Sequence, residues 1–162
     1  MWVKSVEIHV NGLTNLYFTA FFLEFADVIR PALKKTKVYV TGGFRTASGM
    51  IRAIQSGSTD GIGLGRPVCE EPDLPNKLIS GKVSGALNTL FDPDDFGTTL
   101  AAAGFHIKQM SSGYKPFSTV DKESVERFMG VLSAFGKETE ENVQKGTVVA
   151  GIPQKWIEEL KA

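Results

Sequence analysis

Two short segments of the chain place glycine and a cationic side chain where an apolar run ends. The first is Val40–Arg45 (VTGGFR), and the second is Gly61–Pro67 (GIGLGRP). Glycine takes positive φ without steric cost and lets a ligand approach the backbone closely, and the exposed amides of such turns form concavities that bind anions. Arg66 adds a planar fork of donors that matches phosphate oxygens. Together these residue types indicate a site for a phosphate-bearing ligand.

Each of these residues also has a simpler explanation. A tight turn without a ligand accounts for Gly42 and Gly43, and a structural salt bridge accounts for Arg66. The position of Arg66 favours phosphate, because this arginine follows a glycine turn and precedes a short predicted helix. Cys69 lies just past the motif, and we interpret it as a packing residue because no neighbouring group marks it as a thiolate.

The other reactive residue types form no recognisable catalytic set. The chain has two histidines, His9 and His106, and its single cysteine excludes an intrachain disulfide and a multi-cysteine metal site. His106 falls inside a predicted helix, where we expect a packed or solvated imidazole. No Ser-His-Asp set, carboxylate pair or metal-spaced cluster stands out. We therefore assign no catalytic and no metal-ligating residues.

The glycine segments are predicted to follow two buried parallel strands. Val38–Thr41 is a β-branched and aromatic run, Gly61–Gly65 is a second short run, and each ends in a glycine turn. A helix over Thr46–Ser56, with Thr46 as its N-cap and Gly57 as its stop, connects them. The order helix, strand, helix, strand with short links indicates a parallel sheet with right-handed crossovers. Ligands of such sheets bind at the carboxyl ends of the strands.

An amphipathic helix is predicted before the first strand. Its apolar face has helical spacing and consists of Phe22, Phe25, Ala26, Ile29 and Leu33. Pro31 should end or kink this helix, because proline has no amide hydrogen to donate. Further upstream, Val6, Ile8 and Val10 alternate with polar residues. Residues 1–20 are thus an atypical segment, which is one short strand or sequence foreign to the fold.

The second half of the chain is predicted to be helical. A short helix opens at Pro72, and the Asp92–Asp95 stretch starts another, which runs towards Met110, with a capping aspartate and a proline in its first turn. A third helix begins near Asp121, and a last short one follows Pro153. The apolar face of the third is expected to hold Val125, Phe128, Met129 and Leu132.

Three stretches, in this order and spacing, resemble the last two βα units of the Old Yellow Enzyme (NADH:flavin oxidoreductase) family. They are Phe25-Ala26 with Ile29-Arg30-Pro31, then Val40–Thr46, then Gly63–Pro67 with Glu71–Pro75, and the resemblance covers roughly residues 21–81. It implies an α/β fold, namely a partial (β/α)8 TIM barrel with strands seven and eight in residues 21–85. A helical C-terminal tail would follow in residues 86–162.

The resemblance also implies a cofactor. In that family these loops hold the phosphate of FMN, so Gly42 and Gly43, after strand seven, and Gly65 and Arg66, after strand eight, would bind it. The family passes a hydride from NADH or NADPH through FMN to an activated alkene or a quinone, as ene-reductases do. Its flavin-ring and substrate-binding groups lie upstream of the matched region. We therefore expect the C-terminal fragment of such an enzyme, inactive alone and binding FMN weakly if at all.

Length and charge agree with such a fragment. A chain of 162 residues is too short for a whole eight-stranded barrel of about 250 residues. The 18 basic and 18 acidic residues give no sign of the clustered positive charge that nucleic acids and anionic lipids require. The most apolar stretch, Leu13–Phe25, is too short to span a bilayer, so we expect a cytoplasmic protein without a membrane partner. Unpaired strand edges of an incomplete barrel predict self-association.

Two other classes of function stay open. One is a non-catalytic α/β module that binds a phosphate-bearing ligand or a protein partner, and the other is an unrelated small phosphate-binding enzyme. The lack of an acid–base pair in the sequence makes the small phosphate-binding enzyme the weaker of these two interpretations. In the family, the substrate and the choice between NADH and NADPH depend on residues outside the matched region.

Overall fold

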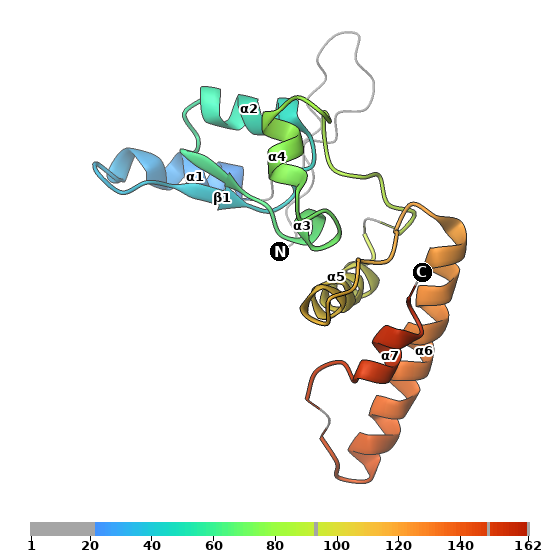
Figure 1. The fold of residues 1–162 in the computed structure, drawn as a ribbon. Coiled ribbons are helices and arrows are strands. Elements are labelled where there is room, and N and C mark those ends of the chain that lie inside the picture. Colours follow the sequence, from blue (N-terminus) through green and yellow to red (C-terminus); the bar gives the residue numbers. More distant parts are fainter. Residues whose placement is uncertain (1–21, 93, 149, 162) are drawn as a thin grey trace. The chain divides into compact units, whose positions relative to one another are not determined.

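A computed structural model describes residues 22–92, 94–148 and 150–161, and these form two compact units (Figure 1). The first unit contains residues 22–65 and 77–85, and the second contains residues 66–76 and the described residues from 86 onward. The sequence predicted a boundary between residues 85 and 86, with the strands before it and the helical tail after it. The structure differs in one segment, because residues 66–76 belong to the helical unit. The expectations for residues 1–20, including the alternating pattern around Ile8, lie outside the described residues.

The first unit alternates helix and strand. It contains α1 (Leu23–Ile29), the 3-10 turn η1 (Arg30–Ala32), β1 (Tyr39–Thr41), α2 (Ala47–Gln55) and β2 (Gly61–Gly63). The two strands pair in parallel, with Val40 opposite Ile62. This order and this pairing confirm the predicted helix, strand, helix, strand pattern. The described residues contain these two strands only, so the larger barrel stays a prediction.

Local capping chemistry sets the ends of α2. The Thr46 side chain accepts a hydrogen bond from the Gly49 amide at 3.2 Å, as an N-cap does. Gly57, with φ of +80°, follows the helix in a conformation that side chains rarely adopt. Residues 77–85 return to this unit, where the Ser84 carbonyl accepts from the Ala47 amide at 2.8 Å.

The core of the first unit is small. It contains Ala26 from α1, Val38 and Val40 from the β1 segment, Phe44, and Ala53 from α2. Both helices thus contribute to the same cluster and cover the same face of the strands.

The predicted apolar face of α1 is only partly buried. Ala26 is 2% exposed, whereas Phe22 and Phe25 are 57% and 62% exposed. The two phenylalanines, which the helical spacing places on this face, are therefore largely exposed. The two short strands offer enough surface to cover Ala26, and the described residues supply nothing that covers the larger side chains.

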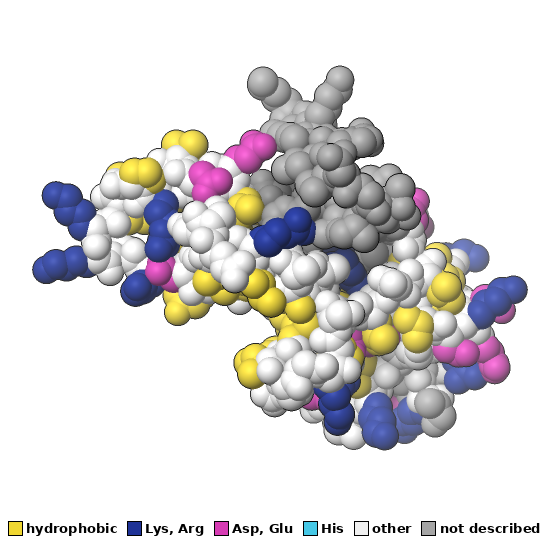
Figure 2. All heavy atoms as spheres, turned by 90° about the horizontal axis from the view of Figure 1, so that it is seen from above, with side chains coloured by type: hydrophobic (Ala, Val, Ile, Leu, Met, Phe, Trp, Pro, Cys, Tyr) yellow, Lys and Arg dark blue, Asp and Glu magenta, His cyan; other side chains and the backbone are white. Residues whose placement is uncertain are grey.

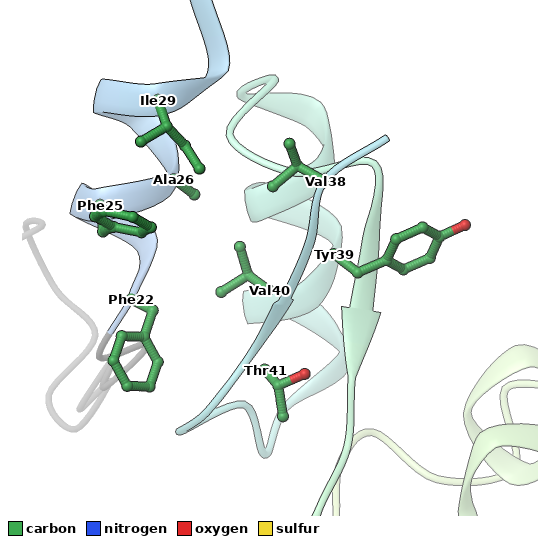
Figure 3. A pocket seen from close by; sticks show the side chains of 8 residues that line it. All are labelled: Phe22, Phe25, Ala26, Ile29, Val38, Tyr39, Val40 and Thr41. Carbon is green, nitrogen blue, oxygen red and sulfur yellow. The ribbon is translucent and has the colours of Figure 1, made fainter. Parts of the chain in front are cut away.

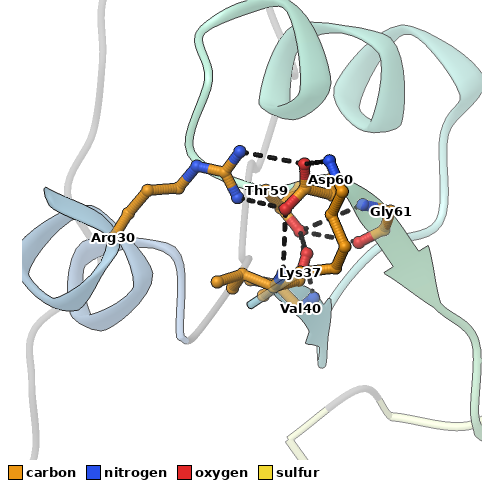
Figure 4. A network of polar contacts seen from close by, with 7 residues as sticks. Arg30, Lys37, Val40, Thr59, Asp60 and Gly61 are labelled. Atoms are coloured by element: carbon orange, nitrogen blue, oxygen red, sulfur yellow. Dashed lines mark hydrogen bonds and ion pairs between the residues drawn. The ribbon is translucent and has the colours of Figure 1, made fainter. Parts of the chain in front are cut away.

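A polar network fixes the amino-terminal side of the strands (Figure 4). Arg30 donates to both carboxylate oxygens of Asp60, and Lys37 and the Val38 amide donate to the same carboxylate. These hydrogen bonds, that from Arg30 first, hold the pKa of the Asp60 carboxyl well below its usual range. The Thr59 hydroxyl accepts from the Val40 amide and lies within hydrogen-bond distance of the Val38 carbonyl. The network ties the end of α1 to both strands.

The second unit is helical. It contains α3 (Arg66–Glu70), the start of α4 (Leu74–Ile79), α5 (Phe96–Ser111), α6 (Lys122–Gln144) and α7 (Gln154–Glu158). Asp121 caps α6 by accepting from the Ser124 amide, and α7 follows Pro153, both as predicted.

Two details of the helical prediction were wrong. Asp95 rather than Asp92 caps α5, by accepting from the Thr98 amide at 2.9 Å. Asp92 instead accepts from the Asp94 amide two residues on, which is a local turn that competes with helix formation. Met129 is 43% exposed and does not belong to the buried face of α6.

Aromatic side chains form the core of the second unit. Phe128 packs edge-on against Phe91 and Phe105 and is stacked on Phe117, with ring centroids 4.6 to 5.6 Å apart. Such pairs add stability beyond the burial of their area. Within the described residues, no helix has the length and apolar character needed to cross a membrane.

Candidate functional site

The two glycine segments leave the same edge of the sheet. Because β1 and β2 run in parallel with Thr41 opposite Gly63, the residues after each strand begin at the carboxyl edge. This is the edge at which α/β sheets bind ligands.

The turn after β1 depends on glycine. Gly42 has φ of +124° and Gly43 has φ of +76°, and both values lie in the region that side chains disfavour. Both positions therefore require glycine, and the backbone amides of such loops can form a concavity that binds anions. The sequence prediction of a glycine turn here is therefore confirmed, while the ligand it serves stays a prediction.

Gly65 serves a different purpose. Its φ is not positive, so backbone strain does not require glycine, but a Cβ added to it would meet no heavy atom within 4 Å. Gly65 thus leaves open space beside the backbone where β2 ends. This suits the close approach of a ligand.

The glycines inside β2 have a packing role that the sequence interpretation did not identify. A Cβ added to Gly61 would overlap the ring of Tyr39, and one added to Gly63 would overlap the side chain of Thr41. These four residues share the face of the sheet opposite the helices. The alternating Gly-Ile-Gly pattern is the sequence signal that could have indicated this close packing between the strands.

Arg66 begins α3, and its guanidinium lies against the start of α5. Nη1 donates to the hydroxyl of Thr99, and the guanidinium carbon lies 5.5 Å from the centre of the Phe96 ring. Among the described residues no carboxylate pairs with Arg66, so the structural salt bridge considered from the sequence is not found there. Sequence reasoning missed Phe96 and Thr99, because they follow Arg66 by about thirty residues and have no motif of their own.

The four predicted phosphate binders divide between the two units. Gly42, Gly43 and Gly65 belong to the first unit, and Arg66 belongs to the second. The three glycines therefore lie in the unit that holds the strands, whereas the contacts of Arg66 lie in the helical unit.

The helix that starts with Arg66 is anchored at its other end. Both carboxylate oxygens of Glu70 accept hydrogen bonds from Thr119, one from the amide at 2.7 Å and one from the hydroxyl at 2.6 Å. Cys69 lies in the same helix, just before Glu70. It is half-buried, and burial raises the pKa of its thiol. A raised pKa lowers the thiolate fraction, which supports the interpretation of Cys69 as a packing residue.

The other titratable candidates are not arranged for catalysis. His106 is buried, its Nε2 lies 3.1 Å from the Phe117 carbonyl oxygen, and burial lowers its pKa to about 4. It is thus a packed imidazole, one of the two roles expected. Tyr114 contacts Lys161, and His9 lies outside the described residues. In the part of the chain that the structure describes, no three His, Cys, Asp or Glu side chains gather as metal ligands.

Comparisons with known proteins identify relatives that match parts of this chain. No protein-family model matches the chain. An NADH-dependent flavin oxidoreductase of Aspergillus parasiticus is 37% identical over 107 residues, which is 66% of this chain and 24% of the relative. Two further NADH-dependent flavin oxidoreductases, from Talaromyces variabilis and a Neonectria species, are 45% and 42% identical over 60 and 59 residues. These matches cover 37% and 36% of this chain, and 14% and 8% of the relatives.

The fold and the glycine segments define a parallel α/β unit with glycine turns at the carboxyl edge of its two strands, and the relatives narrow the class of protein. The chain belongs to the NADH:flavin oxidoreductase family of the Old Yellow Enzyme type. It spans a quarter or less of the length of these relatives.

Proposed function

We propose that the chain is the C-terminal, FMN-phosphate-binding part of an NAD(P)H:flavin oxidoreductase of the ene-reductase type. The observation that carries this proposal is the pair of glycine segments at the carboxyl edge of two parallel strands, in a chain whose relatives are named NADH-dependent flavin oxidoreductases. In the proposal, strands β1 and β2 are strands seven and eight of a TIM barrel.

The local geometry fits a phosphate group. Gly42 and Gly43 have positive φ values, and loops that bind anions through backbone amides often contain such residues. A Cβ added to Gly65 would meet no heavy atom within 4 Å, which leaves room for a ligand beside the backbone. The family resemblance adds Arg66, which follows Gly65 directly in the chain and has donors suited to phosphate oxygens. Amides and a fixed cation are the groups that proteins use to hold such anions.

The chemistry itself would belong to the cofactor. FMN, when bound, accepts a hydride from NADH or NADPH and passes it to an activated alkene or a quinone. The contribution of this chain would be to hold the phosphate and so fix one end of the cofactor. We assign no residue of the chain to proton transfer or to binding of the substrate.

The chain on its own is therefore proposed to be inactive as an oxidoreductase. We expect that adding the purified chain to FMN and NADH, or to FMN and NADPH, does not raise the rate of flavin reduction above that of free FMN. Stopped-flow absorbance at the oxidised-flavin band would measure this rate. A preparation that is yellow, monomeric and readily reduced by either nicotinamide would contradict the proposal.

Self-association is a further expectation of this proposal. The strands β1 and β2 pair only with each other among the described residues, and exposed strand edges readily pair with other chains. Several apolar side chains, including Phe25 and Ile79, are more than half exposed. Sedimentation velocity at rising protein concentration would detect the association.

A further inference from the structure

The guanidinium of Arg66 is held by two side chains from the first turn of α5. Nη1 donates to the hydroxyl oxygen of Thr99, and the guanidinium carbon lies 5.5 Å from the centre of the Phe96 ring. The hydrogen bond fixes one edge of the planar group, and the cation–π contact places the group against an aromatic ring. A long side chain without such contacts samples many rotamers. Arg66 is therefore ordered by side chains of another helix.

The Thr99 hydroxyl is itself oriented by the helix. Its oxygen lies 3.0 Å from the Asp95 carbonyl oxygen and 3.2 Å from that of Phe96, and it donates its hydrogen to this pair. A hydroxyl has one hydrogen and two lone pairs, so the lone pairs stay available to the Arg66 donor. Threonine is also stiff about its first side-chain torsion, because its Cβ is branched. The acceptor that Arg66 meets thus has a fixed direction.

Most of the hydrogen-bonding capacity of Arg66 is left for a ligand. Among the described residues, Thr99 is the one hydrogen-bond partner of this guanidinium, which carries further N–H groups suited to phosphate oxygens. Arg66 is exposed, and the Phe96 ring beside it is 62% exposed. An anion in solution therefore has access to an arginine whose position is already set.

Positive charge alone does not distinguish Arg66 from other cations of the chain. Lys and Arg side chains, drawn dark blue, lie at several separate places on the face shown in Figure 2. A long cationic side chain that is ordered only when it binds an anion loses rotamer freedom at that moment, which weakens binding. The contacts with Thr99 and Phe96 reduce this loss for Arg66, because they order the side chain in the free protein.

We propose that Thr99 and Phe96 are positioning residues, which hold the Arg66 guanidinium ready to bind the phosphate of FMN. They act through Arg66 and do not themselves bind the phosphate. The inference rests on the proposed function, and it gives α5 a part in that site which the glycine segments do not have. The affinity for FMN thus depends on two residues that follow Arg66 by about thirty positions.

Titration of FMN with the full chain and its variants, followed by flavin fluorescence anisotropy, tests this role. Thr99→Val keeps the shape of the side chain but removes the hydroxyl, and we expect it to weaken FMN binding about fivefold, the effect of losing one ordering hydrogen bond. Thr99→Ser restores the hydroxyl and should bind FMN nearly as the wild-type chain does. Phe96→Leu removes the cation–π contact and should weaken binding about threefold.

Two substitutions elsewhere serve as matched controls. The Thr139 hydroxyl donates to the Phe135 carbonyl oxygen four residues earlier, as that of Thr99 does on α5, and no described arginine donates to it. Phe25 is as exposed as Phe96 but lines the groove between α1 and β1 (Figure 3). Thr139→Val and Phe25→Leu should therefore leave FMN binding unchanged. Equal losses in the controls and in Thr99→Val would overturn the proposal.

A double-mutant cycle separates positioning from direct contact with the phosphate. In the Arg66→Met background there is no guanidinium to hold, so Thr99→Val should weaken FMN binding no further. A further loss as large as that in the wild-type background would mean that Thr99 binds FMN by itself, and the proposal would be wrong.

The Nε–H signal of Arg66 in ¹H–¹⁵N spectra gives a readout that needs no flavin. In the free chain this signal should lie away from its random-coil position, and it should move towards that position in Thr99→Val and in Phe96→Leu. A random-coil signal in the wild-type chain, or FMN binding that Thr99→Val leaves intact, would overturn the positioning role alone. A displaced signal in a wild-type chain that does not bind FMN would contradict the proposed function, and the positioning role with it.

Discussion

At Gly43 the backbone conformation decides which residue the chain accepts. Its φ of +76° matches that of Gly57 at +80°, but Gly43 lies at the carboxyl edge of the sheet and Gly57 lies after α2, ahead of β2. The two glycines are therefore a matched pair for separating backbone strain from ligand binding.

Alanine at either glycine should destabilise the fold by a similar amount. Placing a side chain in the left-handed region costs about 1–2 kcal/mol. We expect Gly43→Ala and Gly57→Ala each to lower the free energy of unfolding by about that amount in urea titrations. A cost at Gly43 near zero would show that its turn does not keep the positive φ.

His106 should make the stability of the helical unit depend on pH. Burial lowers its folded-state pKa from 6.5 to about 4, so between these values the unfolded chain binds a proton that the folded chain does not. Stability is therefore full above about pH 6.5 and falls as the pH drops towards 4. The loss approaches about 3 kcal/mol, at roughly 1.4 kcal/mol per pKa unit.

Urea unfolding at pH 7 and pH 4.5, followed by far-ultraviolet circular dichroism, would measure this dependence. His106→Gln removes the titrating group, so its stability should change less between the two pH values than that of the wild-type chain. Identical changes in both proteins would mean that the imidazole is not protected from protonation.

At the scale of single elements, capping side chains define where helices begin. The Asp121 carboxylate accepts from the Ser124 amide at 2.8 Å at the start of α6. Asp121→Ala should lower the free energy of unfolding by about 1 kcal/mol, and Asp121→Asn by less, because asparagine also caps. Thermal unfolding of the two variants would compare them, and equal losses would contradict a capping role.

The link between α1 and the strands depends on Asp60. Asp60→Asn keeps an oxygen that can accept from the Val38 amide but loses the charge partner of Arg30, whereas Asp60→Ala loses both. Hydrogen exchange at the Val38 amide should therefore speed up slightly in the first variant and strongly in the second. Because the folded-state pKa of Asp60 is lowered, this stabilisation exists above the usual aspartate pKa and is lost as the pH falls through the lowered value.

Elements with local signals could be predicted from the sequence. Thr46, Asp121 and Gly57 act on neighbouring amides and carbonyls, so their types suffice to place helix ends. Asp92 and Asp95 have the same chemistry three residues apart, and the tight local turn at Asp92 was not visible in the pattern.

Burial and long-range contacts could not be predicted in the same way. Periodicity shows that Phe25 and Met129 lie on apolar faces, but not whether anything covers those faces. The contacts of Arg66 with Phe96 and Thr99, like that of Arg30 with Asp60, join residues about thirty positions apart without a motif. The glycine turn at residues 42 and 43 was predictable because positive φ is a property of one residue.

At the scale of the whole molecule, family membership and activity are separate questions. The chain spans a quarter or less of the length of its relatives, and we propose that its glycine segments hold one end of a cofactor. The proposed function therefore predicts affinity for the phosphate of FMN without affinity for its ring.

Fluorescence titration of FMN and of riboflavin with the purified chain tests that division most directly, because riboflavin has the same ring and no phosphate. We predict a weak, saturable rise in the fluorescence anisotropy of FMN, no rise for riboflavin, and loss of the FMN response in Gly43→Ala but not in Gly57→Ala. Equal binding of FMN and riboflavin, or an FMN response that Gly43→Ala leaves intact, would contradict the account.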